Sequence, residues 1–309
     1  MKLTMRPYGG EDDYWRIRDF LREVFLRNGR REWTWQVARL DYWRWHVVQN
    51  CNVCPPVEDV TFLWETAGGQ IGAVLNPEGG GEAYLQVHPD LRTPELEEEM
   101  VAAAEQHLPL AIAGDQRGLR VYASGHDEMR HEILTRRGYT RGDWPEHQRR
   151  RSLDLPIPDV PVAEGYTVRA LGGVEELPAR SWVSWRAFHP DEPDEDYQGY
   201  EWYHNIQRIP LYRRDLDIVA VAPGGEFAAF CTLWYDDVTR TGYFEPVGTA
   251  PEHQRRGLAK AVMYEAMRRL KRMGGTLATV GGYSPAANAL YTSVMGPEYS
   301  LCEPWLKEW

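Results

Sequence analysis

The sequence has little of three things, and each shortage excludes a class of protein. Four cysteines in 309 residues are too few for a disulfide scaffold. No apolar run approaches the ~18–20 residues that span a bilayer, and the first eight residues lack the apolar core of a signal peptide. Positive charge is in deficit, with 35 Lys and Arg against 46 Asp and Glu. Because phosphate binding needs a basic surface, we do not expect nucleic acid as a partner. From the lack of long apolar runs and of a signal core, we expect a cytoplasmic protein that has no membrane partner.

Metal ligands are also scarce. Cys51 and Cys54 form a single C-x-x-C pair, and no second pair or histidines at ligand spacing follow them. A zinc site needs further ligands, so the sequence favours two ordinary thiols and no bound metal, with a metal or redox site as the alternative.

The length of the chain and one proline-rich segment indicate two domains. A chain of 309 residues exceeds one typical core. Prolines recur through the segment 155–162, which can continue neither a helix nor a central strand and therefore resembles an extended linker. We expect one domain over residues 1–157 and a second over 163–309.

The two halves show weak internal similarity at a nearly constant offset. The matched segments are Thr4–Pro7 with Thr167–Ala170, Val87–Asp90 with Thr249–Glu252, and Gly138 with Gly296. Such self-similarity predicts that one fold is used twice.

Periodicity predicts the elements of the second half. The patterns indicate strands over 166–171, 218–222, 227–235, 241–249 and 276–280, and helices over 174–188, 197–212, 257–273 and 286–294. This order predicts an α+β fold in which helices flank a central, mixed and mostly antiparallel sheet.

The segment Gln254-Arg255-Arg256-Gly257-Leu258-Ala259 lies between a predicted strand and an amphipathic helix. The first turn of a helix leaves backbone N–H groups unpaired and carries partial positive charge, so it holds phosphates well. Gly257 has no Cβ and lets a diphosphate approach the main chain.

A second motif follows in the last predicted helix. It reads Ser284-Pro285-Ala286-Ala287-Asn288-Ala289-Leu290-Tyr291, and Gly296 comes after it. Together the two motifs resemble the GNAT acetyltransferase superfamily. Gln254, Gly257 and Ala259 match the fixed positions of that superfamily's pyrophosphate loop, and Leu290-Tyr291 matches the pair in its late helix. Ser284 stands where the family often has Asn, and Gly296-Pro297 replaces the usual Gly-Phe.

The resemblance implies acetyl-CoA as a cosubstrate and a direct transfer of the acetyl group to an amine. The residues that would bind the coenzyme are Val247, Gly248, Thr249, Gln254, Arg255, Arg256, Gly257, Leu258, Ala259 and Asn288. In the family the pantetheine arm adds to the strand before the loop, and a Tyr at the position of Tyr291 protonates the departing thiolate. Pro246 has no N–H, so a later residue must polarise the thioester, and we expect a bulge or splay near Gly248.

An amine must lose a proton before it attacks, and Glu245 is our candidate base. It lies two residues before Val247, so simple alternation places both on one side of the strand. A carboxylate that serves only a salt bridge or the solvent is the alternative. Asp236 and Asp237 are weaker candidates because aspartates in turns usually serve the turn.

The first half lacks the loop. Alignment of Pro89 with Pro251 sets Glu95 against Gly257 and Glu97 against Ala259, so carboxylates occupy the place of the anion. We interpret this half as a degenerate GNAT-like domain, in a tandem arrangement similar to that of mycothiol synthase-like proteins.

Two other functions remain open. The chain could be a non-catalytic acyl-CoA sensor, which would need neither Glu245 nor Tyr291, or a coenzyme-free tandem aminoacyl transferase. If it is an N-acetyltransferase, the acceptor is an amine of a small molecule or a protein. Its pocket would come from about 176–212, to which Trp185, Trp202 and Tyr203 could contribute. The oligomeric state is not indicated.

Overall fold

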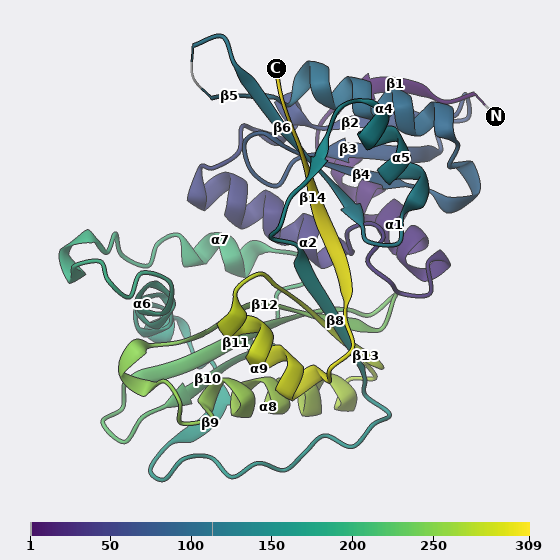
Figure 1. Ribbon diagram of the computed structural model, residues 1–309. Coiled ribbons are helices and arrows are strands. Elements are labelled where there is room, and N and C mark those ends of the chain that lie inside the picture. The colour runs from purple at the N-terminus through teal and green to yellow at the C-terminus, as the bar shows by residue number, and fades with distance from the viewer. Residues whose placement is uncertain (1, 113) are drawn as a thin grey trace. The chain divides into compact units, whose positions relative to one another are not determined.

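The computed structural model describes residues 2–112 and 114–309, which form two compact units (Figure 1). Unit 1 contains the residues up to Gln148 together with Ser300–Trp309, and unit 2 contains Arg149–Tyr299. The units therefore divide before the proline-rich segment, and the end of the chain belongs to unit 1 rather than to the second half. Within the described ranges, every helix is too short or too polar to cross a membrane.

Unit 2 is built on a sheet with the strand order β9–β10–β11–β12–β13. The pairs are antiparallel up to β12, and β12 pairs with β13 in parallel. Its elements are β9 (Thr167–Ala170), α6 (Leu177–Phe188), α7 (Tyr203–Arg208), β10 (Asp217–Val221), β11 (Phe227–Asp236), β12 (Thr241–Thr249), α8 (Leu258–Arg272), β13 (Leu277–Gly282) and α9 (Pro285–Met295). The strand β8 (Glu146–Ser152) lies beside β13.

Unit 1 repeats this plan. Its strand order is β1–β2–β3–β4–β6–β14, with antiparallel pairs except for the parallel pair β4 and β6. Its elements are β1 (Thr4–Pro7), α1 (Glu11–Arg27), α2 (Val37–Tyr42), a π-helix (Trp43–Cys51), α3 (Val57–Val60), β2 (Phe62–Glu65), β3 (Ile71–Asn76), β4 (Glu82–Val87), α4 (Pro94–His107), β5 (Leu110–Ala111), β6 (Arg117–Ser124), α5 (Glu128–Arg136), β7 (Thr140–Arg141) and β14 (Ser300–Glu308). The prediction of two tandem α+β units with mostly antiparallel sheets is therefore confirmed.

The similar segments of the two halves occupy equivalent places. The first pair forms the opening strands β1 and β9. The second pair joins β4 to α4 and β12 to α8, each through a short 3-10 turn that begins at a proline. Gly138 follows α5, and Gly296 follows α9.

Each unit also holds its first helix by a buried ion pair, although the aspartate lies on α2 in unit 1 and on β10 in unit 2. In unit 1, Arg18 of α1 donates from Nε to Asp41 over 2.8 Å. In unit 2, Arg180 of α6 donates from Nε to Asp217 over 2.9 Å. Each aspartate also accepts a tyrosine hydroxyl, from Tyr14 in unit 1 and from Tyr203 in unit 2. Both units thus fasten their first helix by the same chemistry.

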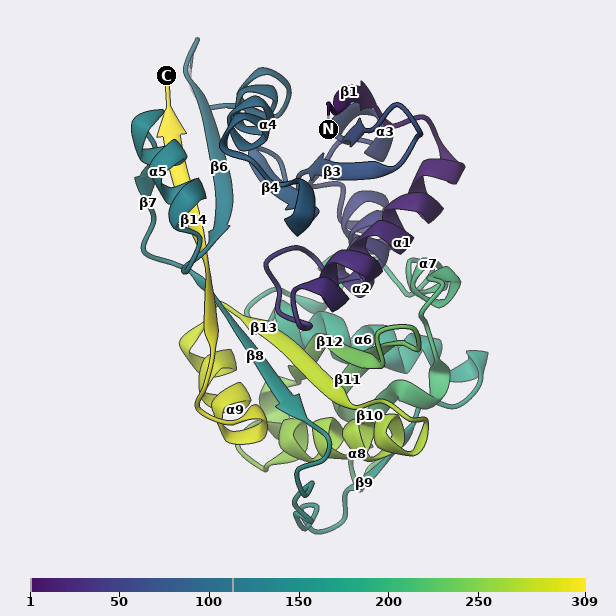
Figure 2. The ribbon, with the colours of Figure 1, turned by 90° about the vertical axis from the view of Figure 1, so that its right-hand side faces the viewer.

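Helices cover both faces of the unit 2 sheet, with α8 along one face and α6 on the other (Figure 2). The apolar stripe of α8 includes Val262, Met263 and Leu270, which are fully buried. Each such side chain stabilises the fold by about 1.5–3 kcal/mol through burial of its apolar surface. This packing holds α8 against β10, β11 and β12.

Two features of the prediction differ from the structure. The helix expected over 197–212 is reduced to α7, because Gly199 has a φ of 91° and Pro210 follows closely. The strand β14 was not expected. It pairs antiparallel with β6 from Cys302 opposite Ser124 to Glu308 opposite Gly118, and Figure 1 shows it in yellow beside β6.

Candidate functional site

The sheet of unit 2 opens where β12 and β13 separate. Their parallel pairing runs from Thr241 opposite Leu277 to Tyr243 opposite Thr279, and no further pair of these strands occurs in the described part of the chain. Beyond that point β12 continues to Thr249 and β13 to Gly282. The separating strands leave a stretch of β12 to which an extended ligand can add as a further strand.

A bulge on β12 lies within this stretch. Leu233 of β11 pairs with Phe244, whereas Cys231 pairs with Val247, so two residues of β12 oppose one of β11. Pro246 is one of the two, and it has no N–H to complete a ladder. The irregularity was expected near Gly248; the structure places it at Glu245–Pro246 instead.

The bulge also removes the alternation on which the expected direction of Glu245 depended. Phe244 and Val247 both belong to the apolar core beneath α8. Simple alternation along β12 is therefore broken between them, and the face of Glu245 does not follow from that of Val247. Gly248 has a separate reason to be glycine: a Cβ there would lie 2.5 Å from the ring of Phe230 and 2.9 Å from Ala187 of α6.

The loop before α8 is open and exposed. Gly257 is the N-cap residue, with a φ of 76°, and a Cβ built on it would meet no atom within 4 Å. Arg255 also has a positive φ, of 59°. In the described ranges, the backbone N–H groups of residues 255–260 have no backbone acceptor, and no side chain caps the helix. The Nε2 of Gln254 donates to the carbonyl of Thr249 over 3.4 Å and so ties the loop to the strand.

Positive charge gathers at the same loop. Arg255 and Arg256 are exposed, and the first turn of α8 holds no acidic residue. No ion pair involves either arginine among the residues that the structure describes, so both guanidinium groups can meet an anionic ligand. Together with the unpaired N–H groups, they make this helix start suitable for a phosphate group.

Tyr291 of α9 packs against the end of β13. Its side chain is 7% exposed, and a Cβ on Gly282 would lie 2.9 Å from its ring. Burial raises the pKa of Tyr291, and the nearby charges of Glu245 and Cys231 raise it further. The hydroxyl therefore stays protonated at neutral pH.

Asn288 holds the surroundings of the tyrosine in place. Its Nδ2 donates to the carbonyl of Gly282 over 3.2 Å, and its Oδ1 accepts from Arg149 over 2.6 Å. Both functional groups of the amide thus already bind the protein.

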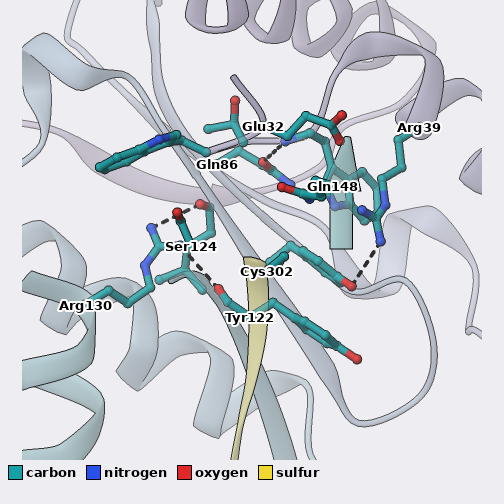
Figure 3. A pocket seen from close by; sticks show the side chains of 13 residues that line it. Glu32, Arg39, Gln86, Tyr122, Ser124, Arg130, Gln148 and Cys302 are labelled. Carbon is teal, nitrogen blue, oxygen red and sulfur yellow. Dashed lines mark hydrogen bonds between the residues drawn. The ribbon is translucent and has the colours of Figure 1, made fainter. Parts of the chain in front are cut away.

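The corresponding place in unit 1 is filled by an arginine. The pairing of β4 with β6 ends at Tyr84 opposite Tyr122. Arg130 of α5 donates across the separating strands, to the carbonyl of Leu85 over 3.2 Å and to that of Tyr122 over 3.4 Å. Figure 3 shows Arg130 reaching toward this part of the sheet. An added strand would have to displace it.

The helix start of unit 1 is closed as well. Glu97 in the first turn of α4 is fully buried and accepts from Arg92 over 2.5 Å and from Arg130 over 2.9 Å. Burial alone would raise the pKa of Glu97, but the charges of Arg130 and Arg92 hold it below its usual value. Thr93 caps the helix by accepting from the N–H of Leu96. A buried anion of the protein itself thus occupies this end of unit 1.

The three aromatic residues expected to line an acceptor pocket have different surroundings. Trp185 is half-buried and stacks on His189 at 5.7 Å between ring centroids. Trp202 is also half-buried and packs edge-on against Tyr203. Tyr203 is 2% exposed and donates its hydroxyl to Asp217, so it is a core residue. Cys51 and Cys54 are free thiols, and the described residues contain no group of three His, Cys, Asp or Glu that could hold a metal.

Part of unit 2 matches a known protein family. Residues 175–296 match the family described as "Acetyltransferase (GNAT) family". The matched segment covers the separating strands, the loop before α8 and the helix that carries Tyr291. Among curated proteins, none matches the chain.

Solved structures show the tandem arrangement. A GCN5-related N-acetyltransferase from Sphaerobacter thermophilus is 18% identical, with a TM-score of 0.67 over 99% of this chain and 95% of its own. A tandem GNAT protein from the clavulanic acid biosynthesis pathway is 16% identical, with a TM-score of 0.63 over 99% and 98%. A GNAT-family acetyltransferase from Colwellia psychrerythraea is 12% identical, with a TM-score of 0.61 over 98% and 99%. The chain therefore has the fold of two GNAT domains in tandem.

Two features of the site were not predicted from the sequence. Gly282 permits the close approach of Tyr291, and Arg130 closes the sheet of unit 1. Gly282 follows a predicted strand, and an interior glycine can signal a close approach. Arg130 had no such signal, because its role depends on strands that are distant in the sequence.

Proposed function

We propose that the chain is an N-acetyltransferase that binds acetyl-CoA in unit 2 and transfers the acetyl group to an amine by direct attack. The observation that carries this proposal is the open start of α8. Gly257 has free space above it, the N–H groups of residues 255–260 have no backbone acceptor within the described ranges, and Arg255 and Arg256 lie beside them. A diphosphate supplies the negative charge and the acceptors that this loop lacks.

The separated strands suit the rest of the coenzyme. The pantetheine arm contains amide groups and would add to β12 over Val247, Gly248 and Thr249, beyond the point where β13 leaves it. Leu258 and Ala259 would contribute backbone N–H groups at the helix start. Asn288 would act through Gly282, whose carbonyl it holds, rather than through a new bond of its own carbonyl oxygen.

Two side chains would carry out the chemistry. Glu245 lies on the stretch of β12 that a thioester would reach, and it would accept the proton of the amine directly or through water. The neutral amine then attacks the thioester carbonyl, the carbon–sulfur bond breaks, and the nitrogen loses a second proton, which restores the Tyr291 hydroxyl through solvent. Tyr291 would protonate the departing thiolate, because its hydroxyl carries a proton at neutral pH. Close placement of the two reactants would supply much of the remaining rate.

Unit 1 would not bind the coenzyme. Arg130 bonds to the carbonyl groups that a pantetheine arm would need, and Glu97 places a negative charge at the helix start. Beyond the last pair with β6, β4 carries Leu85, Gln86 and Val87, none of which is an acid. We therefore assign the catalytic role to unit 2 alone.

The test is a calorimetric titration of acetyl-CoA into the wild type and two variants. Gly257→Glu places a carboxylate in the loop. Gly225→Glu is the matched control. Gly225 lies in an exposed turn of unit 2 and has a φ of 94°, and a Cβ at this position would have no atom within 4 Å. The backbone strain and added charge are thus comparable.

We expect one site per chain in the wild type and in Gly225→Glu, and no binding in Gly257→Glu. Equal binding in all three proteins would move the site away from the loop. Absence of binding to the wild type would contradict the proposed acetyltransferase and favour a transferase that uses no coenzyme A.

A further inference from the structure

A second pocket of unit 1 opens beside the cavity shown in Figure 3 and has no role in the proposed reaction. It is a hollow of about 910 Å³ that is open to solvent. The end of α1, the end of β4 and the start of α5 contribute to its wall. It shares Trp33, Thr34, Leu85 and Arg130 with the neighbouring cavity.

The charged side chains of the wall are mostly positive. Four arginines line the pocket, against the single carboxylate of Asp127; they are Arg27, Arg31, Arg92 and Arg130. Arg92 and Arg130 are already held by Glu97 and Asp127. Arg31 is exposed and forms no ion pair in the part of the chain that the structure describes. Its guanidinium group is therefore available to a ligand.

A residue that lines the same pocket carries a buried polar atom without a hydrogen-bond partner. The Oγ1 of Thr34 is buried without a hydrogen-bond partner, in a residue that is 7% exposed. The indole Nε1 of Trp35, which lines the adjoining cavity, is also buried without a partner, in a residue that is 3% exposed. A buried polar group that lacks a partner destabilises the fold, because its lost hydration is not replaced. The hydroxyl and the indole N–H can both donate a hydrogen bond, so a ligand that accepts hydrogen bonds would satisfy them.

The nearby carboxyl group of Glu32 does not repel an anion in this pocket. Burial and the charge of Glu146 raise the pKa of Glu32, which lines the adjoining cavity, to about 8. Its carboxyl group is therefore mostly uncharged at pH 7.

From these observations we propose that unit 1 binds a small oxyanion, a carboxylate or phosphate group, between the guanidinium of Arg31 and the hydroxyl of Thr34. Guanidinium groups bind both classes through paired N–H donors. Arg130 already closes the sheet next to the pocket, so the ligand is a compact metabolite rather than the extended arm of a coenzyme. The ligand would act as an effector, and the site is independent of the loop at Gly257.

The test uses nuclear magnetic resonance of the full chain with ¹⁵N-labelled tryptophan. Trp33 lines the pocket and is 39% exposed, so its indole N–H resonance reports on the site; Trp33→Phe identifies that resonance. Inorganic phosphate and succinate are titrated separately at constant ionic strength. We expect a saturable shift of the Trp33 resonance with at least one of them, and the better of the two identifies the class of the ligand. Absence of a saturable shift with both would overturn the proposal.

Matched variants separate this site from general attraction to positive charge. Arg31→Gln should raise the apparent Kd at least fivefold, and so should Thr34→Val, which keeps the shape of the side chain. Arg117→Gln removes another exposed arginine of unit 1 that forms no ion pair within the described ranges, and it should leave the Kd unchanged. Equal weakening by Arg31→Gln and Arg117→Gln, or no weakening by Arg31→Gln, would refute the proposed contacts. Because Trp33 lies in unit 1, the result does not depend on acetyl-CoA binding.

Discussion

The role of Tyr291 can be tested by removing one atom. In Tyr291→Phe the ring that packs against Gly282 is kept, and only the hydroxyl is lost. Among the described residues this hydroxyl has no protein partner, so the variant should change the free energy of unfolding by less than about 0.5 kcal/mol. Loss of a general acid should nevertheless lower kcat by roughly 10²–10⁴-fold.

Tyr264→Phe is the control variant, for which we expect a loss of stability and no change in kcat. Tyr264 of α8 is 4% exposed and donates its hydroxyl to the carbonyl of Ser293 over 3.3 Å. Its loss should lower the free energy of unfolding by about 1 kcal/mol, because the bond is removed and the carbonyl loses this donor. The value of kcat should not change, since the hydroxyl is already used within the fold.

The assay follows release of the coenzyme thiol with a thiol reagent, using an amine found by screening, together with urea unfolding of each variant. The pH profile adds a second readout. The pKa of Tyr291 is raised, so the hydroxyl should remain protonated and kcat should not fall through its ionisation up to about pH 10, the usual pKa of tyrosine. Full activity in Tyr291→Phe would show that this tyrosine only packs, and the acid would then have to be water or another group.

Three further perturbations follow from the structure. Glu245→Gln should lower kcat by roughly 10²–10⁴-fold with little change in acetyl-CoA affinity, which calorimetry and steady-state kinetics together would check; unchanged kcat would exclude it as the base. Glu32→Gln should stabilise the protein increasingly as the pH rises from about 5 to 8. Its folded pKa of about 8 lies above the unfolded value, so the wild type loses stability across that window. The gain should be on the order of 4 kcal/mol at pH 8 in urea unfolding, and a gain independent of pH would contradict the assigned cause. Arg180→Met should cost about 3–5 kcal/mol because it leaves Asp217 charged and buried, whereas Arg186→Met should cost much less because its partner Glu252 is exposed. Equal losses in thermal unfolding would contradict that difference.

The elements of unit 2 could largely be predicted because local patterns specify them. The strand expected over 241–249 is β12, and the helix expected over 257–273 is α8 within a residue at each end. Gly257 and the amphipathic stripe after it are signals within one turn of the chain. The loop was recognisable for the same reason.

What could not be predicted depends on contacts between distant segments. The bulge at Glu245–Pro246 is defined by the register of β12 against β11, and no local pattern reports it. The closing of unit 1 by Arg130 requires β4, β6 and α5 to meet. The sequence predicted a division at the proline-rich segment, because no local pattern shows that β14 pairs with β6.

The pairing of β14 also sets the order in which the units can be completed. The sheet of unit 1 includes a strand that the ribosome makes after the whole of unit 2. Unit 2 is thus an insertion within unit 1, and it can reach its final fold while unit 1 still exposes the edge of β6. Synthesis would therefore finish the first unit last, and an interrupted chain would carry a complete unit 2 beside an open sheet.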